Sequence, residues 1–340
     1  MVNFESGLLL RGSIGLLPVL CFLVALMALD SYKLVRLRSI AIVIALGAVA
    51  AGLSYLVNVA VIRGLQLDFG VYARSIGPLV EEAMKGAVIV VLIRTHRIGF
   101  LVDAAIFGFA VGTGFAMIEN LYYLQDLADA SLAVWIVRGF GTALLHGGVQ
   151  SIFAVMVLTL ADRRGSAGPA AVLPPLLAAA VLHAGFNQFV LPPIYQTLLM
   201  LVLLPPMMML VFARSENAVE GWLGRGFDAD RELLQLLDSG EFSQSPHGQY
   251  LLALRERFRG EVIADLVCYL RLYVELALRA KGMLMMRENG LEIAIDAATR
   301  EKFEEMRYLE RTVGRTALLA IKPMLHMSRR DLWQLYMLGK

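Results

Sequence analysis

Several ionisable and amide side chains lie in apolar stretches of this sequence, where charge is rarely tolerated. The segment PLVEEAMKGAVIV, residues 78–90, places two adjacent glutamates and a lysine among aliphatic residues. An ionisable side chain at the centre of a bilayer costs roughly 2.5–3.5 kcal/mol on insertion scales, so such residues usually face a bundle interior or a wet cavity. The candidate functional residues of this kind are Glu81, Glu82, Lys85, Glu119, Asn120, His146, His183 and Asn187.

Carboxylates and imidazoles in a semi-dry pocket are suited to the activation of water. Glu81 or Glu82 can act as a general base, while His side chains and Asn120 or Asn187 can stabilise an oxyanion. Zinc also binds imidazole nitrogen and carboxylate oxygen, and a catalytic zinc keeps one position open for water. The candidate metal ligands are His146, His183, Glu82 and Glu119. Spacing alone does not separate the two mechanisms, and it does not say which glutamate is the base.

Each of these residues also has a purely structural interpretation. Lys85 lies one helical turn after Glu81, and an ion pair between them would leave Glu82 unpaired. Single histidines and asparagines in membrane spans often form only hydrogen bonds between helices. Arg138 either extends toward the interface or neutralises a glutamate. The set of residues is therefore more informative than any one of them.

Seven apolar stretches are long enough to position these residues within a membrane. The chain has 340 residues, of which 58% are hydrophobic, and its mean hydropathy is +0.65; both values are high for a soluble domain. With about 20 residues needed to cross a bilayer, the predicted spans are 12–29, 39–62, 76–93, 100–124, 132–160, 171–191 and 194–213. The predicted fold is an all-α polytopic membrane bundle.

Basic residues in the loops predict the orientation of this bundle. Lys and Arg are concentrated after the first, third, fifth and seventh spans, which predicts an N-terminus outside the cell and a cytoplasmic tail. Counting helical rise from the outer boundary places five residues in the outer half, within about 12 Å of it, and His146 near the middle. The five are Glu81, Glu119, Arg138, His183 and Asn187.

Charge density changes near residue 214, which suggests a domain boundary. Residues 1–213 carry 12 Lys/Arg and 10 Asp/Glu, whereas residues 214–340 carry 19 of each. We predict a transmembrane domain over 1–213, with its motif-bearing core at about 70–195, and a helical cytoplasmic domain over 214–340. A formal net charge of +2 and the lack of a long basic block give no indication of nucleic-acid binding.

The order of the motifs resembles that of the PrsW family of bacterial membrane proteases. EEAMK lies on one predicted span, FAMIEN on the next, a single histidine on the third and HAGFN on the fourth. The family is similar to the CAAX prenyl endopeptidases and the bacteriocin-processing membrane proteases. Under this resemblance, the residues that match the family motifs are Glu81 and Glu82, Lys85, Glu119 and Asn120, His146, and His183 with Asn187.

The resemblance implies an integral endopeptidase of the bacterial inner membrane. Such an enzyme makes the first, extracytoplasmic cut in a membrane-anchored anti-sigma factor, by glutamate-activated water or with a metal such as Zn²⁺. Its expected partners are the membrane-anchored substrate, the lipid bilayer and a cytoplasmic regulator that binds the C-terminal domain. Two alternatives use the same residues differently: a transporter or proton-relay protein, and a non-catalytic membrane sensor whose tail binds a partner.

Overall fold

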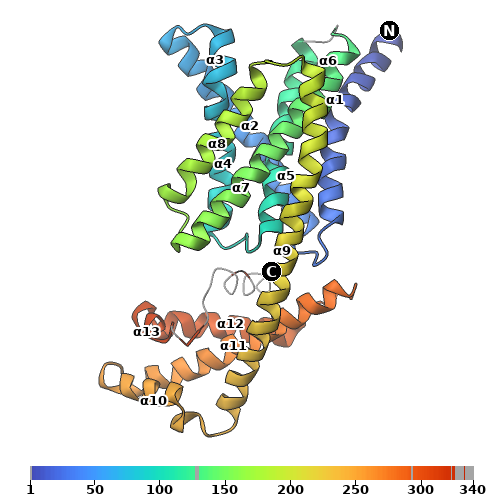
Figure 1. Cartoon of the computed structure of the whole chain (residues 1–340). Coiled ribbons are helices and arrows are strands. Elements are labelled where there is room, and N and C mark those ends of the chain that lie inside the picture. Colours follow the sequence, from blue (N-terminus) through green and yellow to red (C-terminus); the bar gives the residue numbers. More distant parts are fainter. Residues whose placement is uncertain (1, 127–129, 292–293, 323, 326–332, 334–340) are drawn as a thin grey trace. The chain divides into compact units, whose positions relative to one another are not determined.

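Helices make up the whole of the regular structure in the part of the chain that the computed structural model describes, residues 2–126, 130–291, 294–322, 324–325 and 333 (Figure 1). The chain divides into two compact units, Met1–Glu216 and Asn217–Lys340. The predicted all-α fold is therefore confirmed.

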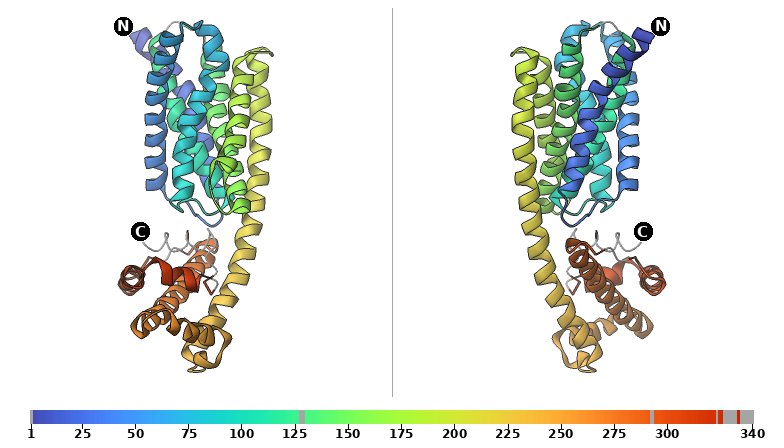
Figure 2. Two further views of the ribbon diagram at one scale, coloured as in Figure 1. Left: turned by 90° about the vertical axis from the view of Figure 1, so that its left-hand side faces the viewer. Right: turned by 90° about the vertical axis from the view of Figure 1, so that its right-hand side faces the viewer.

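The first unit is a bundle of long helices that run side by side (Figure 2). Its elements are α1 (Val2–Ala28), α2 (Leu37–Leu65), α3 (Phe69–Ser75), α4 (Gly77–Arg94), α5 (Leu101–Asp126), α6 (Leu132–Ile136), the π-helix η1 (Val137–Ala143), α7 (Leu144–Arg164), α8 (Pro169–Asn187) and the first part of α9 (Pro193–Asp238).

Six helical segments of the described chain are long and apolar enough to cross a membrane: α1, α2, α5, the continuous run Leu132–Arg164, α8 and α9. The chain is thus a multi-pass membrane protein. The third predicted span, 76–93, corresponds to α4, which has 18 residues. Its charged residues exclude it from the purely apolar spans, although it packs against α2, α7 and α8 within the bundle.

The helix α5 lies at the centre of the first unit, where it packs against α1, α2 and α7. Glycines allow this close approach. A Cβ atom at Gly112 would overlap the main chain of α7 at His146 and Gly147, and one at Gly114 would overlap the main chain of α2 at Ile44. Small residues let membrane helices approach at backbone distance. The separation of α5 and α7, and with it the position of His146, depends on this contact.

A π-helical segment interrupts the run that the sequence predicts as one span over 132–160. It covers seven residues, Val137–Ala143, between α6 and α7. A Cβ atom at Gly139 would overlap the main chain of α1 at Ile14, so η1 and α1 are in backbone contact. Local π-helical geometry is rare and often lies at functional sites. Here it carries Arg138, which is described below.

The second unit consists of the remainder of α9 followed by shorter elements. These are η2 (Phe242–Gln244), α10 (Pro246–Ala253), η3 (Leu254–Glu256), α11 (Gly260–Glu288), α12 (Ala297–Val313) and α13 (Arg315–Ile321). The buried side chains of α11 form most of its core, and Lys281 of this helix pairs with Asp230 at 2.6 Å. α9 passes through residue 214 as one uninterrupted helix.

We predict that Gly112→Ala destabilises the protein, by about 1–3 kcal/mol, because the added methyl group forces α5 and α7 apart. Thermal unfolding in detergent measures this change. The matched control is Gly52→Ala, since Gly52 lies on α2 with nothing within 4 Å of its Cβ position. Alanine is the better helix former, so the control should unfold at the same or a slightly higher temperature. Equal melting temperatures for the two variants would contradict the close contact.

Candidate active site

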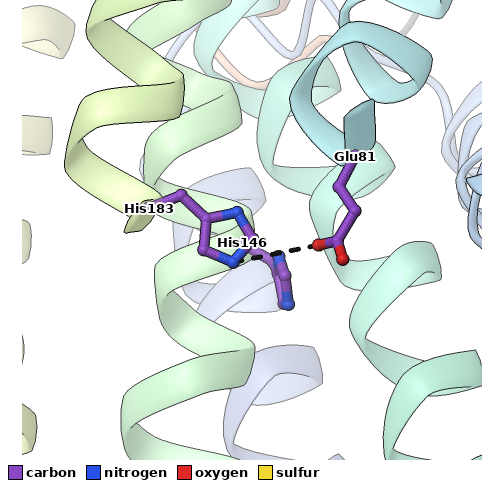
Figure 3. Close-up of side chains that lie close together, drawn as sticks. All are labelled: Glu81, His146 and His183. Atoms are coloured by element: carbon purple, nitrogen blue, oxygen red, sulfur yellow. Dashed lines mark ion pairs between the residues drawn. The ribbon is translucent and has the colours of Figure 1, made fainter. Parts of the chain in front are cut away.

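Three donor side chains from three helices meet in the first unit. Glu81 of α4, His146 of α7 and His183 of α8 each offer one ligand atom, and these atoms all lie within 4.8 Å of one another. Figure 3 shows the Glu81 carboxylate and the His183 ring pointing toward each other, with His146 beside them. The His183 Nε2 atom lies 3.8 Å from Glu81 Oε2, and the two imidazole rings meet edge to face at 4.8 Å.

Glu81 and His183 lie near the ends of their helices, whereas His146 lies where the run Leu132–Arg164 passes from π-helix to α-helix. α4 begins at Gly77 with a proline in its first turn, which favours initiation because proline lacks only an N–H that would be unpaired there. Glu81 follows one turn later. His146 lies in the first turn of α7, directly after η1, and His183 lies about one turn before α8 ends at Asn187. The antiparallel packing of α4 with α8 brings a helix start and a helix end together.

Glu82 is buried beside this cluster and accepts three hydrogen bonds. Its carboxylate receives the Lys85 ammonium at 2.5 Å, His183 Nδ1 at 2.8 Å and the Gln150 amide at 2.5 Å. The purely structural alternative, in which Lys85 pairs with Glu81 and leaves Glu82 unpaired, is not what the structure shows, because Lys85 pairs with Glu82. Side chains three or four residues apart share a helix face, and the structure selects the three-residue spacing.

Glu119 supports the other histidine. Its Oε2 atom lies 2.7 Å from His146 Nε2, and its Oε1 atom lies 3.4 Å from the Arg138 guanidinium. The Lys85 ammonium lies 3.0 Å from His146 Nδ1, so the lysine contacts both Glu82 and His146. Since an ammonium only donates hydrogen bonds, His146 accepts at Nδ1 and donates from Nε2 to Glu119.

The two asparagines lie outside the donor cluster. Asn120 is buried, donates to the Gly15 carbonyl of α1 at 2.7 Å and accepts from Arg138 Nε at 2.9 Å. Asn187 contacts the Ala73 carbonyl of α3 at 3.4 Å. Both amides therefore connect helices here, and their predicted support of an oxyanion stays a prediction.

Gln150 and Arg138 also contribute to the site, although neither belongs to one of the sequence motifs. Gln150 is one turn after His146, and this spacing was the only sequence signal that it shares a face with the histidine. Its Nε2 atom must face Glu82, because the amide oxygen and a carboxylate are both acceptors. Arg138 was an isolated charge in an apolar stretch, and its partner could not be read from the sequence.

The donor set fits a catalytic zinc ion. Zinc at a catalytic site has three protein ligands of the His and Glu type and one open position, and ligands at about 2.0–2.1 Å in tetrahedral geometry are roughly 3.3 Å apart. The ligand atoms of Glu81, His146 and His183 lie within 4.8 Å of one another, so this spacing would be reached by a small inward movement of the side chains. Sequence reasoning predicted Glu82 and Glu119 as the carboxylate ligands. In the structure these two carboxylates are each hydrogen-bonded to one histidine, and the carboxylate grouped with both histidines as a candidate ligand is Glu81.

Charge at the site also favours a cation. Metal binding requires ionised carboxylates and neutral imidazoles, and in that state the three carboxylates of Glu81, Glu82 and Glu119 are accompanied by only the two cations Lys85 and Arg138. One negative charge is left over among these groups. A buried charge is costly unless it is paired, and a bound metal ion would compensate it.

Comparison with known families agrees with this geometry. A sequence model described as PrsW family intramembrane metalloprotease matches residues 36–213, slightly more than half of the chain. The match includes every residue of the cluster and its supporting carboxylates. No curated protein and no solved structure was found to match the chain.

We predict that Lys85→Met strongly destabilises the protein, because it leaves Glu82 buried without its cation. Removal of one partner of a buried pair typically costs about 3–5 kcal/mol. Unfolding in detergent micelles, followed by circular dichroism, measures the loss. The double variant Lys85→Met with Glu82→Gln removes both charges and should recover much of the stability. If the single variant is as stable as the double variant, the pair does not hold the site together.

Proposed function

Because the chain belongs to the PrsW family of intramembrane metalloproteases, we propose that it hydrolyses a peptide bond of a membrane-anchored protein at Glu81, His146 and His183. The observation that carries this proposal is the meeting of three donor atoms from three helices within 4.8 Å. These residues are separated by up to 102 positions along the chain and belong to the segment that matches the family.

Zinc is the metal that we propose, held by Glu81, His183 and His146. His146 would bind it through Nδ1 in place of the Lys85 hydrogen bond, with Nε2 still donating to Glu119. When bound, it supplies a Lewis acid that polarises the substrate carbonyl and lowers the pKa of a bound water to about 7. The protein contributes the orientation of its own donors. Histidine ligands in metal sites usually donate their second ring N–H to a carboxylate, which fixes the ring.

His183 has this arrangement. Its Nδ1 atom lies 2.8 Å from Glu82, while its Nε2 atom faces Glu81. Glu82 is itself fixed by Lys85 and Gln150, and its side chain has no exposed surface. A carboxylate engaged by three donors is poorly placed to take a proton from water. We therefore assign Glu82 to the support of His183.

Glu81 is the better-placed carboxylate for contact with the attacking water. Its side chain is 22% exposed, and its one ion pair among the described residues is the long contact with His183. It can therefore contact both a bound metal and the water, and hold the proton that the water releases. Glu81 is the residue on which the metal mechanism and the glutamate–water mechanism both depend.

The proposed substrate is a membrane-anchored protein of the anti-sigma factor type in the bacterial inner membrane. The resemblance of EEAMK, FAMIEN and HAGFN to the bacterial family supports this substrate class. The loop charges support an orientation with the site in the outer half of the membrane. The donor cluster lies wholly within the first unit. For the second unit, which forms the proposed cytoplasmic tail, we propose that it binds a regulator.

We predict that Glu81→Gln abolishes proteolysis, with a loss of at least about 100-fold, because the amide neither takes a proton nor binds zinc as a carboxylate does. The measurement is cleavage of a panel of single-span membrane proteins, including anti-sigma factors, by purified wild type and by the variant in liposomes. The matched control is Glu232→Gln, since Glu232 is exposed on α9, and it should cleave like wild type.

A zinc chelator provides the second arm of this experiment. Loss of cleavage with the chelator, and recovery on adding zinc back, would support the metal mechanism. Cleavage that resists the chelator but requires Glu81 would replace it with glutamate-activated water. Full cleavage by Glu81→Gln would remove the protease assignment to this site.

We also predict that the cut lies on the extracytoplasmic side of the substrate span or in its outer half. Mass spectrometry of the two fragments locates the cleaved bond in a substrate of known topology. A cut at the cytoplasmic end of the span would contradict the proposed orientation, whatever the identity of the substrate.

A further inference from the structure

The two histidines of the cluster are supported in the same manner. His183 contacts Glu82, and Glu82 contacts the cation of Lys85. His146 contacts Glu119, and Glu119 contacts the cation of Arg138. An amide completes each arrangement: Gln150 on Glu82 and Asn120 on Arg138. The first arrangement contains the EEAMK lysine, whereas the cation of the second lies outside every motif.

Arg138 is held from three directions. Its Nε atom donates to Asn120 Oδ1 at 2.9 Å, its Nη2 atom lies 3.4 Å from Glu119 Oε1, and its guanidinium carbon lies 3.8 Å from the ring centre of Tyr123. The side chain is 12% exposed. A planar guanidinium that is stacked on a ring and bonded at its edge has little freedom to rotate.

The support continues to the main chain of α1. Asn120 is 2% exposed and donates to the Gly15 carbonyl at 2.7 Å. The π-helix that carries Arg138 is in backbone contact with α1 at Gly139. A series of contacts therefore runs from α1 through Asn120, Arg138 and Glu119 to His146, and it crosses four elements: α1, α5, η1 and α7.

Resting on the proposed function, we propose that Arg138 is a positioning residue for the protease reaction. It holds Glu119 against His146, and thereby sets the orientation of the imidazole that meets Glu81 and His183. The π-helix η1 is the element that places it there: its wider turn lets Gly139 contact α1 while Arg138 faces Glu119. Groups behind metal-binding histidines typically change metal affinity or activity by about 10–100-fold.

A purely structural role makes a different prediction. If Arg138 only neutralised a half-buried glutamate, its removal would lower stability and leave the folded fraction fully active. A positioning role lowers kcat and zinc affinity in the folded fraction, with little change in KM, because the bound substrate is not contacted. The two roles are therefore separated by measurements on folded protein.

The experiment compares Arg138→Met, Arg138→Lys, Glu119→Gln and the double variant Arg138→Met with Glu119→Gln, all as full-length protein. Zinc affinity is measured by competition with a fluorescent chelator. The kcat and KM values are measured with a substrate that the wild-type protein cleaves in the panel experiment. We expect Arg138→Met to lose about 10–100-fold in kcat and in zinc affinity, and Arg138→Lys to recover part of both. The double variant should be no worse than Glu119→Gln, since residues in one network are not additive.

The matched control is Arg94→Met. Arg94 ends α4 and donates to the Ala167 carbonyl at 2.9 and 3.1 Å, so its loss also removes a partly buried guanidinium contact, away from the cluster. It should keep wild-type kcat and zinc affinity. If Arg138→Met fails to fold, Arg138→Lys and Asn120→Ala carry the test, with smaller expected losses in the same two quantities.

Two results would overturn the proposal. One is wild-type kcat and zinc affinity in folded Arg138→Met while Glu81→Gln is inactive. The other is a double variant whose losses equal the product of the single losses, which would mean that Arg138 does not act through Glu119. Full activity of Glu81→Gln would instead overturn the proposed function, and the zinc measurements would still test whether Arg138 positions His146.

Discussion

The architecture of the site depends on one buried carboxylate. Glu82 receives hydrogen bonds from its own helix α4 through Lys85, from α7 through Gln150 and from α8 through His183. A carboxylate so far from water is stable only when every strong acceptor position is engaged. This requirement couples the rotation of three helices, because a shift in any of them would leave the charge without a donor. Lys85 extends the coupling to His146.

Close helix packing makes this coupling rigid. At Gly112, α5 contacts the main chain of α7 beside His146, and at Gly114 it contacts α2. Interiors packed at this density transmit displacement rather than absorb it. These glycines are not part of the site, but they determine the distance between α5, which carries Glu119, and α7, which carries His146. The same logic applies to Gly139, where η1 meets α1.

Local sequence patterns were sufficient to predict the fold class and most of the site residues. The lengths and hydropathy of the apolar stretches predicted a membrane helix bundle, because backbone groups in lipid must be satisfied within helices. The cost of buried charge singled out Glu81, Glu82, His146 and His183 as candidates, and all four lie together. Spacing placed Lys85 on the same helix face as Glu81, but Glu82 also satisfies helical spacing, and it is Glu82 that Lys85 contacts.

Helix rotation and register decided the rest, and neither is encoded by periodicity within a single span. Glu81 rather than Glu82 supplies the carboxylate of the donor cluster, since the Glu82 oxygens are already hydrogen-bonded to Lys85, Gln150 and His183. Asn120 turns to α1, and Arg138 reaches Glu119 from a π-helical turn that an α-helical pattern does not predict. Residue types and the membrane class follow from the cost of transferring side chains into lipid, a local quantity. The identity of the partners follows from contacts between helices far apart in the chain, and only packing specifies these.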